Sequence, residues 1–255
     1  MLIDTHCHLD LPLLLPKLTE ILSRASDCSV NGFIVPGVDP DGWNGIMALN
    51  ADRRIHAAPG IHPMRAERWS ETEMERLCLL LSESVAIGEI GLDYTVGMPA
   101  KELQERAFRS QLIIARGAGL PVIIHCRKAF ADTLKIIKKE KIGDFGGVMH
   151  AFSGSLETAR QCIDLGMKIG IAGSVTWTGA RKPTAVVAGT VMKDILLETD
   201  SPDMAPQSRR GEPNEPALLV EIAEKIARLK GLLVEDVARI TTENAKELFR
   251  LGMTK

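Results

Sequence analysis

The chain has 255 residues, of which 45% are hydrophobic and 25% are charged, and its formal net charge at pH 7 is −2. This composition is ordinary for a globular enzyme with one large core. A near-neutral chain does not offer the wide basic surface that duplex DNA requires, so any contact with nucleic acid should be local. The five cysteines include no CxxC pair, which disfavours both a disulfide framework and a zinc finger.

Hydropathy gives no indication of a membrane protein. No stretch approaches the roughly 18 continuous apolar residues that a membrane helix needs. The first residues, Met1 to Asp4, lack a basic segment followed by an apolar one, which a secretory signal would have. We therefore expect a cytoplasmic protein without a membrane span.

Apolar, β-rich runs alternate along the chain with stretches of helical periodicity. The runs that predict strands are residues 2–5, 32–36, 56–61, 85–90, 122–125, 147–150, 168–172 and 195–199. Helical periodicity is found at residues 71–83, 101–118, 130–139 and 156–165, and further helices are predicted at 217–230, 234–240 and 244–251. Thr241 or Thr242 would cap the last of these. Between the eighth strand and the final helices, residues 202–216 form a polar, Pro-rich loop that is long enough to act as a lid.

Strands that are apolar on both faces and separated by helices are typical of parallel βαβ units. Eight such units indicate a closed barrel. The predicted fold is therefore α/β, a single (β/α)8 TIM barrel with additional C-terminal helices, and residues 1–255 should form one domain.

Histidines and acids gather at the ends of the predicted strands, which in such barrels lie on the face that carries the active site. Six of them offer ligands for a metal: His6, His8, Glu89, His125, His150 and Asp200. Imidazole and carboxylate are the ligands of zinc, manganese and similar cations. A single catalytic ion does not take six protein ligands, so we expect two divalent ions. A lone histidine at a strand end is usually structural, but four of them beside two acids are difficult to explain in that way.

The motif Thr5-His6-Cys7-His8 near the start of the chain predicts two histidine ligands for one metal ion. Alternate side chains of a strand point to opposite faces, so His6 and His8 share one face while Cys7 points to the other. Asp4 falls on the His6 face and deeper in the barrel, where we expect it to support the ligands.

With these motifs in place, the chain resembles the TatD family of metal-dependent hydrolases nearly from end to end. The resemblance is carried by six segments: Asp4-Thr5-His6-Cys7-His8, Gly60-Ile61-His62-Pro63, Gly88-Glu89-Ile90-Gly91-Leu92-Asp93, Ile124-His125-Cys126-Arg127, His150-Ala151-Phe152-Ser153-Gly154 and Glu198-Thr199-Asp200-Ser201-Pro202. It implies a TIM barrel, one to three divalent ions, and hydrolysis of phosphodiesters in DNA or RNA, commonly from a 3′ end. Related members are also deacylases of mischarged transfer RNA.

The resemblance also implies how the ligands are shared. His6, His8 and Asp200 would hold one ion and His125 and His150 the second, with Glu89 between the two ions. We expect Asp200 and Glu89 to be catalytic, with Asp200 accepting the proton from the attacking water. The donor set admits zinc, manganese, magnesium or cobalt.

Three further residues are predicted to contact substrate. His62 and Arg127 are candidates for binding phosphate, since the arginine offers a planar fork of donors. His62 could instead cap the turn that follows it. Asp93 would orient a ligand or a substrate hydroxyl. Trp177 and Tyr94 fall on loops where a base could stack, or where each could simply pack the top of the barrel.

Three functions are compatible with these residues. The first is a deoxyribonuclease or phosphodiesterase that acts on single strands or 3′ ends of nucleic acid. The second is hydrolysis of an ester or C–N bond in a small molecule or an aminoacyl-tRNA. The third is a partner-binding protein without catalysis, against which the full ligand set argues. We expect a monomer, because the helices show no long apolar stripe beyond what barrel packing uses.

Overall fold

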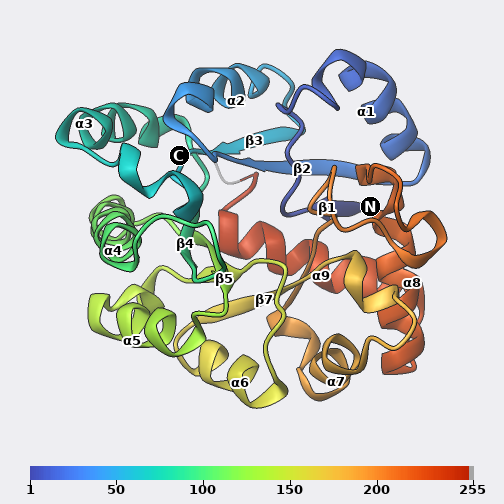
Figure 1. Ribbon diagram of the computed structural model, residues 1–255. Helices are drawn as coiled ribbons and strands as arrows, with labels where there is room; N and C mark the ends of the chain where they lie inside the picture. Colours follow the sequence, from blue (N-terminus) through green and yellow to red (C-terminus); the bar gives the residue numbers. More distant parts are fainter. Residues whose placement is uncertain (253–255) are drawn as a thin grey trace. The chain divides into compact units, whose positions relative to one another are not determined.

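The computed structural model describes residues 1–252 (Figure 1). It divides into two compact units. The first is made of Met1–Val35, Ala151–Arg160 and the chain from Ile169 onward, and the second of Pro36–His150 and Gln161–Lys168. The expectation of a single domain stays a prediction. Over the described range, no helix combines the length and the apolar character needed to cross a membrane.

Strands and helices alternate along the described chain, as predicted. The strands are β1 (Leu2–Asp4), β2 (Val30–Pro36), β3 (Ile55–Ala58), β4 (Ile87–Asp93), β5 (Val122–Arg127), β6 (Gly147–Met149), β7 (Met167–Ile171) and β8 (Ile195–Leu197). The helices are α1 (Leu18–Asp27), α2 (Trp43–Leu49), α3 (Glu71–Leu80), α4 (Lys101–Ala118), α5 (Phe130–Glu140), α6 (Leu156–Asp164), α7 (Arg181–Gly189), α8 (Leu219–Lys230) and α9 (Val234–Phe249). This is the element order of a (β/α)8 chain.

The strands of the first unit pair in parallel. β1 pairs with β2, and β7 pairs with β8. The end of β1 also meets the end of β8, because the backbone nitrogen and hydroxyl of Thr5 both donate to the Leu197 carbonyl at 3.0 Å. The residues that follow β1 and β8 therefore emerge side by side.

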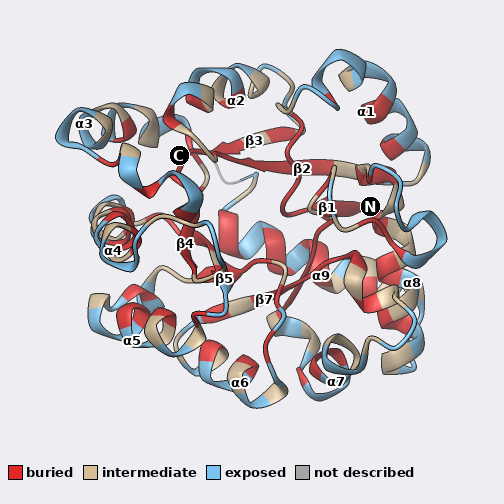
Figure 2. Cartoon of the chain, in the orientation of Figure 1, coloured by how far each residue is buried: buried red, intermediate tan, exposed pale blue. Residues whose placement is uncertain are grey.

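In the second unit, β4 pairs in parallel with β5, and β5 with β6. All seven residues of β4 are buried, which suits a parallel strand covered on both faces (Figure 2). Glycines let β5 approach closely: a Cβ on Gly91 would lie 2.0 Å from the His125 carbonyl oxygen, and one on Gly88 would lie 2.5 Å from the Ile123 Cβ. Because β4 continues to Asp93, Glu89 lies inside the strand and not at its end.

The helices are amphipathic, with their buried residues turned to the strands and exposed residues outward (Figure 2). α4 has the predicted bounds and ends at Gly119, whose left-handed backbone (φ 65°) is a common helix terminator.

The predicted break between two final helices was wrong, since α9 is continuous. Thr241 donates its hydroxyl to the Val237 carbonyl within the helix, and Thr242 donates to the Met1 carbonyl, so neither residue caps a new helix.

Candidate metal centre

The first unit brings His6, His8 and Asp200 together. The Nε2 atoms of His6 and His8 are 3.2 Å apart, and they lie 3.6 and 3.8 Å from Asp200 Oδ1. One ligand atom from each residue lies within 4.8 Å of the other two. Ligands bound tetrahedrally at zinc distances are about 3.4 Å apart, so these three donors fit a divalent ion.

The backbone explains why these side chains converge. Asp200 donates its backbone nitrogen to the His6 carbonyl at 2.9 Å, and His8 donates to the Ser201 carbonyl at 2.8 Å. Cys7, between the two histidines, is buried; its backbone nitrogen donates to the Ile34 carbonyl, and its Sγ atom lies 3.7 Å from the same oxygen. His6 and His8 thus converge while the Cys7 thiol turns to β2, although all three residues follow β1 and do not lie within it.

Asp4 lies beneath this cluster and ties its two strands together. Its carboxylate accepts hydrogen bonds from the Thr199 backbone nitrogen at 2.9 Å, from the Thr199 hydroxyl and from the His6 backbone nitrogen. Burial raises the pKa of Asp4 to about 7, although the hydrogen bonds from Thr199 oppose that shift. Asp4 therefore orients the segments that carry His6 and Asp200.

Asn214 supports Asp200 from the other side. Its side-chain nitrogen donates to the carbonyls of Thr199 and Asp203, both at 2.8 Å, and its backbone nitrogen donates to the Pro202 carbonyl. Asn214 is fully buried. The Asn214 side-chain amide thus joins residues on either side of Asp200, which adopts a left-handed backbone (φ 56°).

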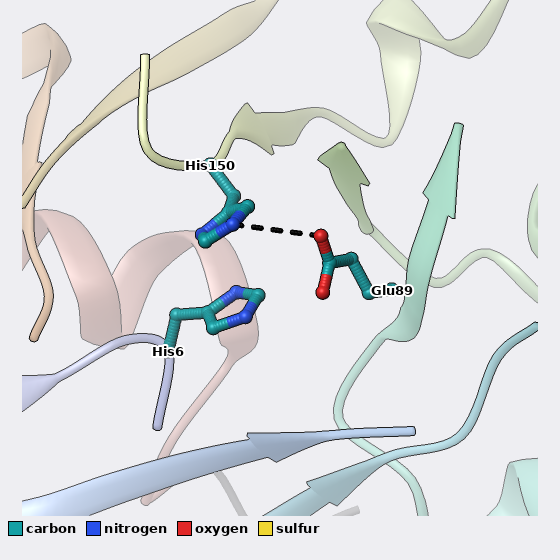
Figure 3. A group of neighbouring side chains, drawn as sticks. All are labelled: His6, Glu89 and His150. Atoms are coloured by element: carbon teal, nitrogen blue, oxygen red, sulfur yellow. Dashed lines mark ion pairs between the residues drawn. The ribbon is translucent and has the colours of Figure 1, made fainter. Parts of the chain in front are cut away.

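In the second unit, three histidines surround the buried carboxylate of Glu89. Its Oε1 atom lies 2.8 Å from His125 Nδ1, 3.6 Å from His62 Nε2 and 3.5 Å from His150 Nε2. Figure 3 shows the His150 ring and the Glu89 carboxylate facing each other across this ion pair. His62, Glu89 and His125 also place three ligand atoms within 4.8 Å of one another. This donor set fits a second divalent ion.

Asp93 holds His125 from the other side of the ring. Its Oδ2 atom lies 3.1 Å from His125 Nε2, while Thr95 donates both its backbone nitrogen and its hydroxyl to Asp93 Oδ1. Burial favours a higher pKa for Asp93, but the hydrogen bonds from His125 and Thr95 outweigh it and lower the pKa. Burial likewise works to lower the pKa of His125, yet Asp93 and Glu89 raise it. His125 is therefore held between two carboxylates.

The residues predicted to contact substrate occupy different surroundings. His62 lies beside Glu89. Its Nδ1 atom accepts a hydrogen bond from the Met64 backbone nitrogen at 3.1 Å, so the turn-capping alternative is correct for Nδ1. Arg127 ends β5 and is exposed, and among residues 1–252 its guanidinium has no hydrogen-bond or ion-pair partner. Arg127 is two residues after His125 on the same strand, so the two side chains point to the same face.

Glu198 is a residue whose role the sequence reasoning missed. It is fully buried after β8, and its carboxylate accepts a hydrogen bond from the Ala151 backbone nitrogen. A Cβ on Gly170 would lie 2.6 Å from Glu198 Oε2, so that glycine makes room for the acid. An ionisable residue directly after the apolar run 195–197 was the available signal.

Parallel strands, alternating helices and buried imidazole–carboxylate clusters define a metal-dependent hydrolase of the α/β barrel class. The chain belongs to the TatD family: a family model described as TatD related DNase matches residues 3–250. The metal-dependent hydrolase YabD of Bacillus subtilis (strain 168) is 39% identical over 255 residues, covering 99% of this chain and 100% of YabD.

Two further comparisons agree with this assignment. A protein named 3′-5′ ssDNA/RNA exonuclease TatD, from Pantoea vagans (strain C9-1), is 33% identical over 248 residues, covering 91% of this chain and 93% of its own. The crystal structure of YjjV, a TatD homologue from Escherichia coli K12, superposes with a TM-score of 0.93 at 33% identity over 98% of both chains. The predicted fold class, a (β/α)8 TIM barrel, and the predicted family are confirmed.

Proposed function

We propose that this metal-dependent hydrolase is a phosphodiesterase that removes nucleotides from 3′ ends of single-stranded nucleic acid. The observation that carries the proposal is the pair of donor clusters, one around Asp200 and one around Glu89, each with three ligand atoms within 4.8 Å. The exonuclease name of the relative from Pantoea vagans supports the choice of substrate.

Each cluster has a defined part in this proposal. His6, His8 and Asp200 would hold one divalent ion. Glu89 and His125 would hold a second together with His150, while His62, whose Nε2 lies 3.6 Å from Glu89 Oε1, offers a further nitrogen to the same cluster. Bound divalent ions lower the pKa of water and neutralise the charge that develops on a phosphodiester. Zinc, manganese, magnesium and cobalt all accept this mixture of nitrogen and oxygen ligands.

The protein's own side chains supply the remaining chemistry. Asp200, which is partly exposed, accepts the proton of the attacking water. Arg127 pairs with the phosphate through its guanidinium, which is exposed and on the same strand as His125. Asp93 keeps the His125 ring in one orientation, because it binds Nε2 while Glu89 binds Nδ1.

Loss of the metals tests the proposal directly. Hydrolysis of a single-stranded oligonucleotide should disappear after chelation and return when manganese or zinc is added. His125→Ala should remove activity that His56→Ala retains, because His56 is half-buried on β3 and belongs to neither donor cluster. Oligonucleotide cleavage that survives both chelation and His125→Ala would contradict the proposal.

The same assay can identify a different substrate class. Aminoacyl-tRNA and a panel of small esters, lactones and amides should be turned over more slowly than the oligonucleotide. Faster turnover of any of these, again dependent on metal and on His125, would instead assign the site to ester or C–N bond hydrolysis.

A further inference from the structure

Trp177 is held in a fixed position on the loop that follows β7. Its indole nitrogen donates to the Ala205 carbonyl at 2.8 Å. The neighbouring Thr178 backbone nitrogen donates to the Gln207 side chain at 2.7 Å, and the Gln207 backbone nitrogen donates to the Thr176 hydroxyl at 2.8 Å. These bonds tie the loop after β7 to the segment after β8.

Close backbone contact reinforces this connection. A Cβ on Gly173 would lie 2.0 Å from the Met204 carbonyl oxygen, so the two segments touch in a way that only glycine permits. β7 pairs with β8 in parallel, and the two loops therefore leave the same end of the pair. Asp200 lies three residues past the end of β8 in one of them, and Trp177 directly follows the 3-10 turn Gly173–Thr176 in the other. The Trp177 indole therefore lies on a loop at the same end of the β7–β8 pair as Asp200, the proposed proton acceptor.

Arg210 covers the indole with its guanidinium, whose carbon atom lies 4.6 Å from the ring centroid. The side chain is exposed and has no carboxylate partner among the described residues. Its neighbour Arg209 differs, because its guanidinium pairs with Glu212 at 3.0 Å. Of these two adjacent arginines, only Arg210 rests on an aromatic ring and is not neutralised by an acid.

Two further cations follow Trp177 closely in the sequence. α7 begins with Arg181 and Lys182, and its first turn contains no acid. Cations at the start of a helix are disfavoured by the helix dipole, so their presence adds to an already positive end. Glu212 offsets the charge of Arg209, which leaves Arg181, Lys182 and Arg210 as the cations of these two loops that can attract phosphate.

We propose that Trp177 and Arg210 form a nucleotide-binding platform, on which a base of the single strand stacks against the indole while Arg210 pairs with the adjacent phosphate. This inference rests on the proposed nuclease function. Base–aromatic stacking is stronger than an exposed cation–π contact, and Arg210 gains a charge-assisted hydrogen bond when it moves to the phosphate. The platform accepts any base, because stacking does not read hydrogen-bonding edges.

Tyr94 offers a contrast that favours Trp177. The Tyr94 hydroxyl lies 3.2 Å from Asp132 and 3.5 Å from Glu105, and the Lys101 ammonium lies 4.9 Å from its ring centroid. The Lys101 ammonium is itself paired with Asp132 at 2.6 Å. Moving it from the ring would therefore break an ion pair, whereas moving Arg210 breaks none.

Tryptophan fluorescence gives a direct readout, since the chain has three tryptophans and the other two are buried. Trp43 is 0% exposed and Trp69 is 8% exposed, while Trp177 is half-buried. The metal-loaded protein would be titrated with a single-stranded oligonucleotide whose 3′-terminal linkage is a phosphorothioate that resists cleavage. We expect the emission to be quenched by this oligonucleotide, and much less by one whose last nucleotides are abasic.

Substitutions test base stacking on Trp177 and phosphate pairing by Arg210 separately. Trp177→Leu should abolish the quenching and weaken binding by roughly tenfold, whereas Trp177→Phe should keep most of the affinity because a ring remains. Arg210→Gln should reduce the slope of log affinity against log salt by about 0.7, the value for one phosphate contact on a single strand. Arg209→Gln, matched in position and charge, should leave both the quenching and the slope unchanged.

The outcomes distinguish this inference from the function on which it rests. If Trp177→Leu, folded as judged by circular dichroism, cleaves oligonucleotides with the KM of the unmodified protein, the platform is wrong and the nuclease proposal stands. The platform is equally wrong if abasic ends bind as tightly as normal ends. If the unmodified, metal-loaded protein neither binds nor cleaves oligonucleotides, both proposals are overturned.

Discussion

Asp200 combines two properties that the proposed reaction needs, because it lies beside two imidazoles and remains partly exposed. Replacing its carboxylate with an amide of the same size removes the proton acceptor. Asp200→Asn should therefore lower kcat by about 10²–10⁴-fold, the usual contribution of a general base. Asp203→Asn, which changes an exposed carboxylate three residues away, is the matched control. A value of kcat within threefold of the unmodified protein in Asp200→Asn would rule out this role.

Asp93 acts through His125. Its carboxylate fixes one ring nitrogen while the other faces Glu89. Asp93→Asn should weaken metal binding at this cluster by about 10–100-fold, the range for a residue that orients a ligand. Titration calorimetry would measure the change. Asp132→Asn, which removes a carboxylate paired with Lys101, should bind metal normally, and equal affinities in the two variants would contradict the assignment.

Most candidate ligands could be named from the sequence, because imidazoles and acids after apolar runs are visible without a structure. The orientations of their side chains could not be predicted from the sequence. His62 was predicted to bind phosphate, yet one of its nitrogens caps a turn and the other faces Glu89. Which nitrogen of a ring meets which carboxylate depends on packing between residues far apart in sequence. For the same reason Glu198 received no role, although its carboxylate fills the space over Gly170.

At the scale of elements, β4 and β5 position the Glu89 cluster through their close approach. Gly91 has φ 144°, a backbone conformation that is strained for any residue with a side chain. A Cβ added there would also lie 2.0 Å from the His125 carbonyl oxygen. Gly91→Ala should reduce the free energy of unfolding by about 3 kcal/mol and weaken metal binding, because the strand that carries His125 must shift. Urea denaturation and calorimetry would measure the two effects.

Gly117→Ala supplies the control for that substitution. Gly117 lies in α4, and a Cβ there meets no atom within 4 Å. Alanine should raise stability by about 0.5–1 kcal/mol, since it restricts the unfolded chain and favours the helix. If Gly91→Ala behaves like Gly117→Ala, the close approach of β4 and β5 is not what positions His125.

Element boundaries were predicted less well than element types. β4 was expected at residues 85–90 and spans Ile87–Asp93, because Gly91, which in sequence suggests the end of a strand, lies opposite β5 and continues the pairing. The two threonines near residue 241 suggested a helix start, yet each donates its hydroxyl to a carbonyl and leaves α9 intact. Both differences arise from long-range or side-chain hydrogen bonds that local patterns do not encode.

For the whole molecule, metal binding and stability should be linked. A ligand that binds only the folded protein stabilises it by about 2.7 kcal/mol at a hundred times its dissociation constant. Adding manganese or zinc to chelator-treated protein should therefore raise the Tm, and His6→Ala should reduce the increase. His56→Ala should respond like the unmodified protein. An increase in Tm that is the same in all three would show that the ions bind elsewhere.

Removal of nucleotides from a 3′ end by metal held at these clusters is tested most directly by cleavage of end-labelled single strands. Metal-loaded protein would be given one oligonucleotide labelled at its 5′ end and another labelled at its 3′ end, beside Glu89→Ala prepared identically. We predict a ladder of progressively shorter 5′-labelled products and immediate release of the 3′ label as a mononucleotide, both absent with Glu89→Ala. Equal cleavage by Glu89→Ala, or no cleavage by the metal-loaded parent, would contradict the proposed function.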